Sequence, residues 1–282
     1  MAEGHAVHGM AQRLRQLAGT TVRSVSPDGA FPASAYDGKR LVDTEAHGKH
    51  LLVRFDDIEG AVHIHCGMTG RVSTRRHRRA LGDDGFPKTE PPAANGLRWR
   101  LLNRTHVADV IAPTICEVLN QEDTRALHAR LGPDPLRDDH EPEPFFTTTT
   151  QSRRAIGMLL LDQRIVAGIG NVYRAEILFR QGIHPWSPGN RLSSTELAAI
   201  WSDAVGLMAI GLGAGWIVAA PRQLTEAREL IDQGLPVPRW PKTYAVYGRR
   251  GKPCRQCGTP IEAARLGQQT AFWCPVCQPP RD

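Results

Sequence analysis

The chain has 282 residues, which is enough to bury a large core and to form two domains. Its 35 lysines and arginines outnumber the 29 aspartates and glutamates, and the formal net charge of +6 favours a polyanionic partner. No run of about 18 apolar residues is present, so no membrane span is expected. The first residues also lack the basic-then-apolar pattern of a signal peptide. We therefore expect a soluble, basic, cytoplasmic protein.

An amphipathic helix is predicted directly after the first five residues, ending at Gly19. Its buried face comprises Val7, Met10, Leu14 and Leu17. Ahead of this helix, the small residue Ala2 permits removal of Met1, which would leave a free amine beside Glu3. A carboxylate at a helix start is favourable in any protein, so a structural role for Glu3 is the alternative to a chemical one.

Short segments with alternating polarity follow the helix, and turn residues separate them. These segments are residues 20–26, 41–46, 51–55, 61–65 and 97–102. The pattern predicts an antiparallel β-sandwich or barrel. The turn between the second and third segments places Lys49 at a hairpin tip, where a lysine is most often a solvated charge. A basic run of four arginines then leads into a Gly- and Pro-rich loop, residues 82–95. We interpret this run either as part of a solvated loop or as a segment that contacts DNA backbone. The arginines are Arg75, Arg76, Arg78 and Arg79.

The strand pattern stops at a proline-punctuated break, residues 131–136, and residues 138–235 read as mainly helical. Ser193 and Glu196 have the spacing of a capping box that starts a long helix. The buried stripe of that helix comprises Leu197, Ile200, Trp201, Ala204 and Met208. We predict three domains, with boundaries at 1–130, 131–240 and 241–282.

Two helical patterns flank a glycine-containing connector in residues 157–179. Ile156, Leu159, Leu160 and Gln163 share one face of the first helix, and Val172, Ala175, Ile177 and Leu178 pack the second. In the connector, Gly168 and Gly170 permit unusual backbone conformations and close approach of another chain. Asn171 can cap the second helix, whose amino end favours an anion such as phosphate. An ordinary helical hairpin with a glycine turn is the alternative.

Four cysteines near the carboxyl end form two close pairs that are separated by 16 residues. They are Cys254, Cys257, Cys274 and Cys277. Four thiolates at this spacing give zinc a closed tetrahedral shell, so one structural zinc ion is predicted. A ribbon this small depends on the metal to fold. Cys66 and Cys116 stand alone, and only burial is expected of them.

The string that ends in Gly-Ile-Gly-Asn-Val-Tyr-Arg-Ala-Glu-Ile-Leu-Phe resembles the helix–two-turns–helix (H2TH) of the formamidopyrimidine-DNA glycosylase and endonuclease VIII family. Five further motifs resemble the family in the same order: the amino terminus, the Gly-Lys hairpin, the His-x-Gly-Met-Thr-Gly loop, the Leu-Gly-Pro-x-Pro-Leu junction and the zinc finger. The resemblance implies an α+β fold: an antiparallel β-sandwich with a flanking helix, a helical H2TH domain and a zinc ribbon.

The resemblance also implies roles for individual residues. Family members begin Met-Pro-Glu-Gly; the proline nitrogen attacks the anomeric carbon of the sugar, and the glutamate, here Glu3, donates a proton that opens the ring. Lys49 occupies the place of a lysine that reaches the active site and contacts phosphate. Glu176 matches a family glutamate that points toward the amino-terminal amine.

Contacts to DNA follow from the same resemblance. His65 would lie near DNA phosphate, and Met68 would fill the gap left by the flipped nucleotide, since extruding a base leaves a vacated stack. Gly170 and Asn171 belong to the turn that grips the DNA backbone. The implied partner is damaged DNA, duplex or single-stranded, bound between the domains by a monomer at the nucleoid.

Two positions depart from the family pattern. Ala2 replaces the proline; its primary amine has an unperturbed pKa near 8 and can still form a Schiff base, but it lacks the ring that aims it. Gln269 stands where the finger carries a phosphate-clamping arginine, and Arg265 lies out of register. The Asp-Pro-Arg-Arg-Phe-Gly segment of the oxidised-guanine branch is absent near residues 103–109, which favours the endonuclease VIII branch and oxidised pyrimidines.

We therefore expect a base-excision DNA glycosylase in which lyase activity through the Ala2 amine is weakened or altered. A catalytically impaired protein that binds lesions or abasic sites is one alternative. A monofunctional glycosylase for an unusual adduct is another.

Overall fold

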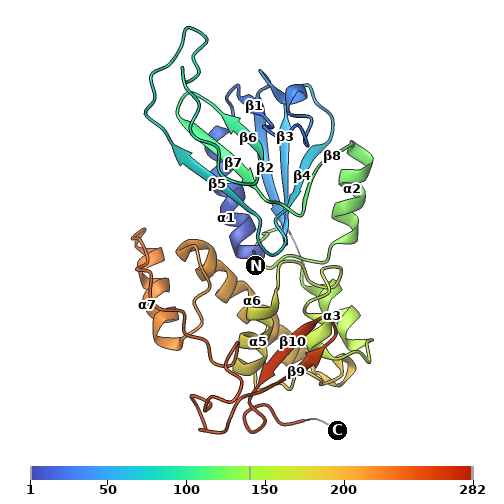
Figure 1. The fold of residues 1–282 in the computed structure, drawn as a ribbon. Helices are drawn as coiled ribbons and strands as arrows, with labels where there is room; N and C mark the ends of the chain where they lie inside the picture. Colours follow the sequence, from blue (N-terminus) through green and yellow to red (C-terminus); the bar gives the residue numbers. More distant parts are fainter. Residues whose placement is uncertain (1, 140, 281–282) are drawn as a thin grey trace. The chain divides into compact units, whose positions relative to one another are not determined.

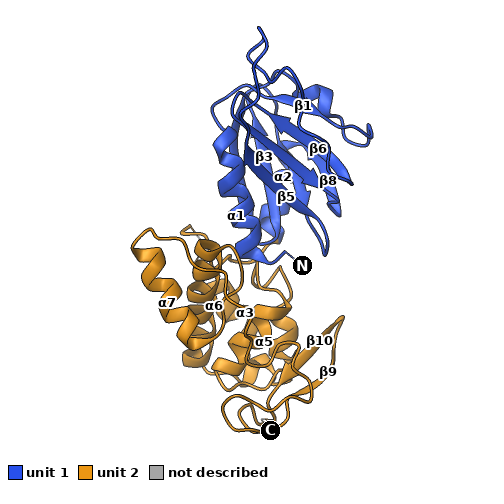
Figure 2. Ribbon diagram, turned by 60° about the vertical axis from the view of Figure 1, so that its left-hand side comes forward, with its two compact units in different colours: residues 1–130 blue, residues 131–282 orange. Residues whose placement is uncertain are grey.

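A computed structural model describes residues 2–139 and 141–280 (Figure 1). The chain divides into two compact units, residues 1–130 and 131–282 (Figure 2). Each unit has its own cluster of buried apolar side chains, and each is described by itself below.

Unit 1 is built on two antiparallel four-stranded sheets. The first sheet has the order β1-β6-β7-β5, and the second has the order β2-β3-β4-β8. The strands of the first sheet are β1 (Arg23–Val25), β6 (Leu97–Leu102), β7 (His106–Ile111) and β5 (Arg71–Arg76). Those of the second are β2 (Leu41–His47), β3 (His50–Phe55), β4 (Ala61–His65) and β8 (Ile115–Leu119). The predicted β-sandwich is therefore confirmed.

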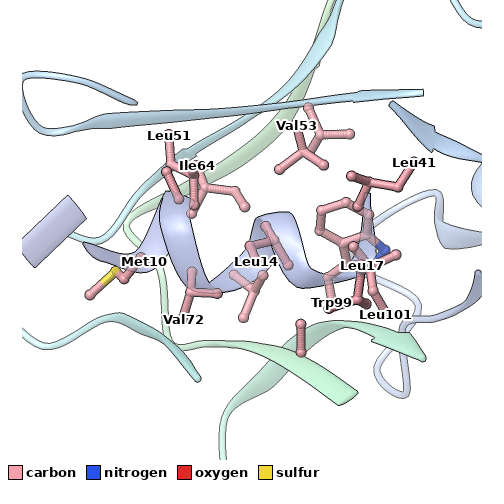
Figure 3. Packing of buried hydrophobic residues seen from close by; sticks show 14 of the residues in the cluster. Met10, Leu14, Leu17, Leu41, Leu51, Val53, Ile64, Val72, Trp99 and Leu101 are labelled. Atoms are coloured by element: carbon pink, nitrogen blue, oxygen red, sulfur yellow. The ribbon is translucent and has the colours of Figure 1, made fainter. Parts of the chain in front are cut away.

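The predicted amino-terminal helix lies against both sheets (Figure 3). It comprises α1 (Gly4–Leu14) and a 3-10 turn, Arg15–Leu17, and it contacts β2, β3 and β5. All four apolar residues of the predicted face are buried in the core cluster. Trp99 fills the other end of this core, and its indole N–H donates to Ser24 Oγ at 2.9 Å. The buried apolar face is thus what holds α1, and with it Ala2 and Glu3, against the sheets.

Three strands and one helix of unit 1 were not predicted from the sequence. Strand β5 contains Arg75 and Arg76, so this part of the basic run is paired sheet and the solvated-loop interpretation is wrong for it. Strand β7 carries Asp109, which is fully buried and has an ion pair with Arg100, 2.6 Å between Oδ1 and Nε, and another with Arg75 at 2.9 Å. A charge in the middle of a strand breaks the polarity pattern. The remaining two elements are β8 and the helix α2 (Gln121–Arg130).

The same buried arginine ties the Gly- and Pro-rich loop to the first sheet. Arg100 donates from its guanidinium to the backbone carbonyls of Pro91 and Pro92 as well as to Asp109. The two loop carbonyls thereby accept from guanidinium N–H groups of Arg100 in addition to Asp109. This satisfies the need of a buried polar group for hydrogen-bond partners.

Unit 2 is helical, with a two-stranded finger hairpin. Its helices are α3 (Glu143–Thr150), α4 (Ile156–Leu159), α5 (Asn171–Arg180), α6 (Ser194–Ala214) and α7 (Pro221–Asp232). The hairpin consists of β9 (Glu262–Leu266) and β10 (Gln269–Trp273). The capping box of α6 is present, with Glu196 N–H donating to Ser193 Oγ at 3.2 Å and Ser193 N–H to Glu196 Oε2 at 2.9 Å.

Helix α6 is long and apolar enough to span a membrane by length and composition, with a mean hydropathy of 1.6 over 18 residues. That is weak evidence, because the core helix of a water-soluble domain passes the same test. Here the predicted stripe faces the core of unit 2, with Leu197, Ile200, Ala204 and Met208 fully buried.

Candidate active site and metal centre

Glu3 occupies the N-cap position of α1 and is 1% exposed. Its backbone carbonyl accepts from the N–H of Ala6 at 2.9 Å and of Val7 at 3.3 Å, which fixes the start of the helix. The side chain makes no capping hydrogen bond, so the carboxylate does not serve to cap α1. Ala2 is half-buried and packs against the unit 1 core, whereas Met1 lies outside the described residues.

Lys49 lies in the two-residue turn between β2 and β3, where His47 pairs with His50. Gly48 has φ +58°, the left-handed conformation that the first central residue of such a hairpin turn requires and glycine adopts at little cost. Burial lowers the pKa of Lys49 to about 8, and the Glu3 carboxylate opposes the shift. At pH 7.5 a group with this pKa is about one quarter neutral. The fold thus brings Glu3 and Lys49, which are 46 residues apart in the sequence, close enough for the charge of Glu3 to affect the pKa of Lys49.

His65 is the last residue of β4 and pairs with His50 on the neighbouring strand β3. Its pKa is lowered by burial, then by the charges of His63 and Lys49, so the imidazole is neutral in the free protein near pH 7. Its backbone carbonyl accepts from Thr114 N–H at 2.9 Å, which anchors the loop that follows. Glu3, Lys49 and His65 therefore form one cluster in unit 1.

Met68 is 66% exposed, so it does not belong to the core. The loop that carries it depends on glycine. Gly67 has φ +62°, and a Cβ there would lie 1.9 Å from Thr114 Oγ1. A Cβ on Gly70 would lie 2.4 Å from the Cys66 carbonyl oxygen. No side chain fits at either position, so the shape of the loop that carries Met68 requires both glycines.

The connector of the H2TH motif differs from its prediction at Gln163. This residue follows α4 instead of belonging to it, and its side chain ties the glycine connector together. Its Oε1 accepts from Gly168 N–H at 2.9 Å, and its Nε2 donates to the Ile169 carbonyl at 3.1 Å. Gly168 has φ +91°, so the expected left-handed glycine is present.

Asn171 does not cap α5, contrary to the prediction. Gly170 occupies the N-cap position, and Asn171 is the first helical residue, 6% exposed. Its Nδ2 donates to the Thr270 carbonyl in the finger hairpin at 3.1 Å, and its Oδ1 accepts from the guanidinium of Arg174. The amide is therefore used to join the H2TH turn to the finger.

Arg174 is a buried residue of this junction that the sequence reading missed. It is 1% exposed, and its guanidinium donates to Thr270 O at 2.8 Å and to Gly157 O at 3.2 Å. The spacing of three residues from Asn171 puts both side chains on one face of α5, and this was the available signal.

Glu176 lies on α5 and is buried. It is 1% exposed, and its carboxylate accepts three backbone N–H groups, from Ala245 at 2.7 Å and from Val246 and Tyr247 at 3.0 Å each. Burial raises its pKa, and the three hydrogen bonds oppose the shift. The carboxylate fixes the segment that leads into the finger. This is a different task from the one that the resemblance implied.

The four predicted cysteines converge at the base of the finger hairpin, with their sulfur atoms within 4.8 Å of one another. The Cys254 and Cys277 sulfurs are 3.9 Å apart, and those of Cys257 and Cys274 are 3.4 Å apart. A tetrahedral shell with Zn–S bonds of about 2.3 Å has sulfur atoms about 3.8 Å apart, so the donor set fits zinc. The N–H of Cys277 donates to Cys274 Sγ at 3.4 Å, which orients that thiolate. The site holds one structural zinc ion, as predicted.

Gln269 begins β10 and pairs with Leu266 across the hairpin. Arg265 lies opposite Thr270, and its Nε donates to the carbonyl of Gly267 at 2.9 Å. The register therefore keeps the Arg265 guanidinium turned to the hairpin's own loop, and Gln269 is a neutral residue at this strand end.

Solved structures of DNA repair glycosylases share this fold. The Lactococcus lactis formamidopyrimidine-DNA glycosylase in complex with abasic-site DNA aligns with a TM-score of 0.73 and 19% identity, over 99% of this chain and 100% of that chain. The MutM (Fpg) protein of Thermus thermophilus aligns with a TM-score of 0.71 and 27% identity, covering 98% of each chain. Fold, H2TH motif and zinc finger together define the class as that of zinc-finger DNA glycosylases.

Sequence comparison leads to the family. Three family models match: the formamidopyrimidine-DNA glycosylase N-terminal domain over residues 1–110, its H2TH domain over 131–219, and the zinc finger found in FPG and IleRS over 251–280. Endonuclease 8 1 of Mycobacterium tuberculosis is 41% identical over 284 residues, 99% of this chain and 100% of the relative. The formamidopyrimidine-DNA glycosylase of Methylococcus capsulatus is 30% identical, over 86% of this chain and 83% of that protein. The chain belongs to the formamidopyrimidine-DNA glycosylase and endonuclease VIII family and is a homologue of endonuclease VIII.

Proposed function

We propose that this protein is a DNA glycosylase that flips damaged bases, chiefly oxidised pyrimidines, out of DNA and excises them. The observation that carries the proposal is the cluster at the amino end of unit 1. A buried carboxylate, Glu3, adjoins the Ala2 nitrogen in the chain and shares an electrostatic environment with Lys49, a lysine of lowered pKa. A buried acid beside a lysine of lowered pKa is characteristic of a catalytic centre.

In the proposed reaction, removal of Met1 frees the amine of Ala2. Its lone pair forms a bond to C1′ of the damaged nucleotide, and the C1′–base bond breaks with its electron pair leaving on the base. The departing base takes up the proton that the attacking nitrogen loses, which restores a lone pair on that nitrogen. Glu3, as the carboxylic acid, gives its proton to O4′ while the C1′–O4′ bond breaks and nitrogen and carbon form the Schiff base. Without the proline ring the amine is aimed less well, and an error of about 1 Å can cost on the order of a hundredfold in rate.

The choice of oxidised pyrimidines rests on the turn between β6 and β7. Asn103 Oδ1 accepts from Thr105 N–H at 2.9 Å and from His106 N–H at 2.7 Å, so the turn is short and closed on itself. Its tip carries Arg104, and no phenylalanine stands in it. Such a turn lacks the arginine–phenylalanine wedge of the oxidised-guanine branch.

Borohydride trapping on a duplex with one abasic site tests the proposal, with Glu3→Gln and Lys49→Ala variants alongside. We expect a covalent adduct that maps by peptide sequencing to Ala2 and is lost in Glu3→Gln. An adduct that maps to Lys49 would move the nucleophile to the lysine, whose neutral fraction permits it. No adduct and no base release from a panel of oxidised pyrimidines would overturn the glycosylase proposal.

A catalytically impaired protein that binds abasic sites is the second candidate, and the substitutions at Ala2 and Gln269 favour it. It predicts tight binding to an abasic duplex with no excision of any base. Mass spectrometry separates the candidates early, because retention of Met1 would exclude attack by the Ala2 amine.

A further inference from the structure

A row of polar side chains crosses three strands on the face of the second sheet that points away from the unit 1 core. His50 on β3 is paired with His65 on β4, and His63, two residues before His65, is paired with Glu117 on β8. Side chains two residues apart in a strand share a face, so all four lie on the same side. Their neighbours Leu51 and Ile64 point the other way, into the core, and are fully buried.

Hydrogen bonds connect three of these residues in a line. Glu117 Oε1 lies 2.9 Å from Nδ1 of His63, and Nε2 of His63 lies 2.8 Å from Nδ1 of His50. His63 is only 3% exposed, whereas the Glu117 side chain is 51% exposed. The line therefore runs from solvent at β8 inward to the residue that follows Lys49.

The chemistry of these atoms gives the line a direction. An ionised carboxylate only accepts hydrogen bonds, so Nδ1 of His63 carries the proton. In the tautomer with its proton on Nδ1, His63 accepts at Nε2, and Nδ1 of His50 is the donor. Burial lowers the pKa of His50 to about 3, assisted by the charges of His63, His65, Arg130 and His47, and this residue is neutral at physiological pH. The hydrogen bond from His63 to Glu117 thus determines which ring nitrogen carries the proton in His63 and in His50.

The inner end of the line touches the candidate site. The rings of His50 and His65 have centroids 5.1 Å apart at an interplanar angle of 52°, so the two imidazoles pack against each other. The charge of Lys49 in turn lowers the pKa of His65. A ring fixed by hydrogen bonds on one side is a rigid surface against which His65 can be held.

We propose that Glu117 and His63 are positioning residues, which fix the tautomer and orientation of His50 and through it hold His65 in the orientation that contacts DNA phosphate. The last step rests on the proposed function and on the phosphate contact that the family resemblance implies for His65. None of these residues touches the reacting atoms, and the effect is transmitted by two hydrogen bonds and one ring contact.

Binding to a duplex that carries a tetrahydrofuran abasic-site analogue tests the proposal, with Glu117→Gln compared with Glu122→Gln. Glu122 is an exposed carboxylate in the first turn of α2, so each variant removes one negative charge from unit 1. General electrostatics would tighten binding equally in both. We expect Glu117→Gln to weaken binding by about tenfold instead, the lower end of what partners of ligand histidines cost at metal sites. The double variant Glu117→Gln/His63→Leu should bind no more weakly than His63→Leu alone, because both changes break one line.

The histidine tautomers supply a readout that a purely structural role would not change. In histidine-labelled protein without DNA, ¹⁵N spectra should show His50 and His63 protonated at Nδ1, and Glu117→Gln should mix the tautomers of both. Unmixed tautomers, or Glu117→Gln binding as Glu122→Gln does, would overturn the proposal. A wild-type protein with no preference for the abasic duplex would overturn the proposed function and the His65 step together, and the spectra would still decide the part that concerns His50.

Discussion

The amide of Asn171 donates to the backbone carbonyl of Thr270 at 3.1 Å, across a separation of 99 residues. Arg174 donates to the same carbonyl oxygen at 2.8 Å and also to Asn171. One carbonyl of the finger hairpin thereby receives two donors from α5. The glycine connector of the H2TH motif and the finger hairpin are therefore joined directly by hydrogen bonds in this protein.

Replacing Arg174 with methionine should loosen this junction. The change removes one of the two donors of the Thr270 carbonyl, which keeps the amide of Asn171, and removes the donor of the buried Gly157 carbonyl. A buried carbonyl left unsatisfied costs about 1–3 kcal/mol. We expect faster amide hydrogen exchange throughout β9 and β10, measured by NMR or mass spectrometry. Arg180→Met is the matched control, because Arg180 lies on the same helix but pairs with Asp203 at 2.9 Å. Equal exchange in both variants would contradict the role given to Arg174.

The sequence predicted local features of the fold well. The apolar face of α1 and the capping box at Ser193 depend on residues a few positions apart, and the four cysteines lie within one short segment, residues 254–277. The tasks of Asn171 and Glu176 depend on partners 99 and 69 residues away, which no local pattern contains. Strand β7 was not predicted for a related reason. Its buried charge, Asp109, is stabilised by Arg100 and Arg75 from other strands.

Asp109→Asn should destabilise unit 1 strongly. The change leaves the guanidinium of Arg100, which is 2% exposed, without its charged partner, and breaking a buried pair in this way costs about 3–5 kcal/mol. Urea unfolding followed by the fluorescence of Trp99 would measure the loss. Glu90→Gln is the control; its carboxylate is 40% exposed and 3.7 Å from Arg100, so a loss of at most about 1 kcal/mol is expected.

Binding to the abasic duplex should weaken as the pH rises through the pKa of Lys49. Burial lowers this pKa to about 8, so between pH 7 and 9 the ammonium that we propose to attract phosphate becomes a neutral amine. Bound phosphate favours the charged form and moves the midpoint upward. Fluorescence anisotropy at constant ionic strength should show this loss in the wild type and a flat profile over the same range in Lys49→Met. A wild-type profile as flat as that of the variant would exclude a phosphate contact by Lys49.

Removal of zinc should unfold the finger and abolish binding to the abasic duplex. Metal binding and folding are coupled in a ribbon of this size, and the apolar cluster beneath the finger includes the ligands Cys254 and Cys274. A colorimetric indicator should release one zinc per chain, and Cys274→Ser should be purified without it. Cys116→Ser, a change in unit 1, should retain the metal and the binding. Full binding by zinc-free protein would show that the finger contributes nothing to DNA recognition.

Gln269→Arg should restore a charged clamp to the finger. Position 269 starts β10 next to the hairpin loop, is partly exposed, and has Leu266 as its cross-strand neighbour, so a longer side chain can extend into solvent without displacing the core. One additional phosphate contact should steepen the dependence of log K on log salt by about 0.9 for duplex DNA, with tighter binding at low salt. Arg265→Gln, which removes a charge from the neighbouring strand, should leave the slope nearly unchanged because that guanidinium is turned to the Gly267 carbonyl. An unchanged slope in Gln269→Arg would mean that phosphate does not reach this strand end, and the glutamine would then be no loss to the protein.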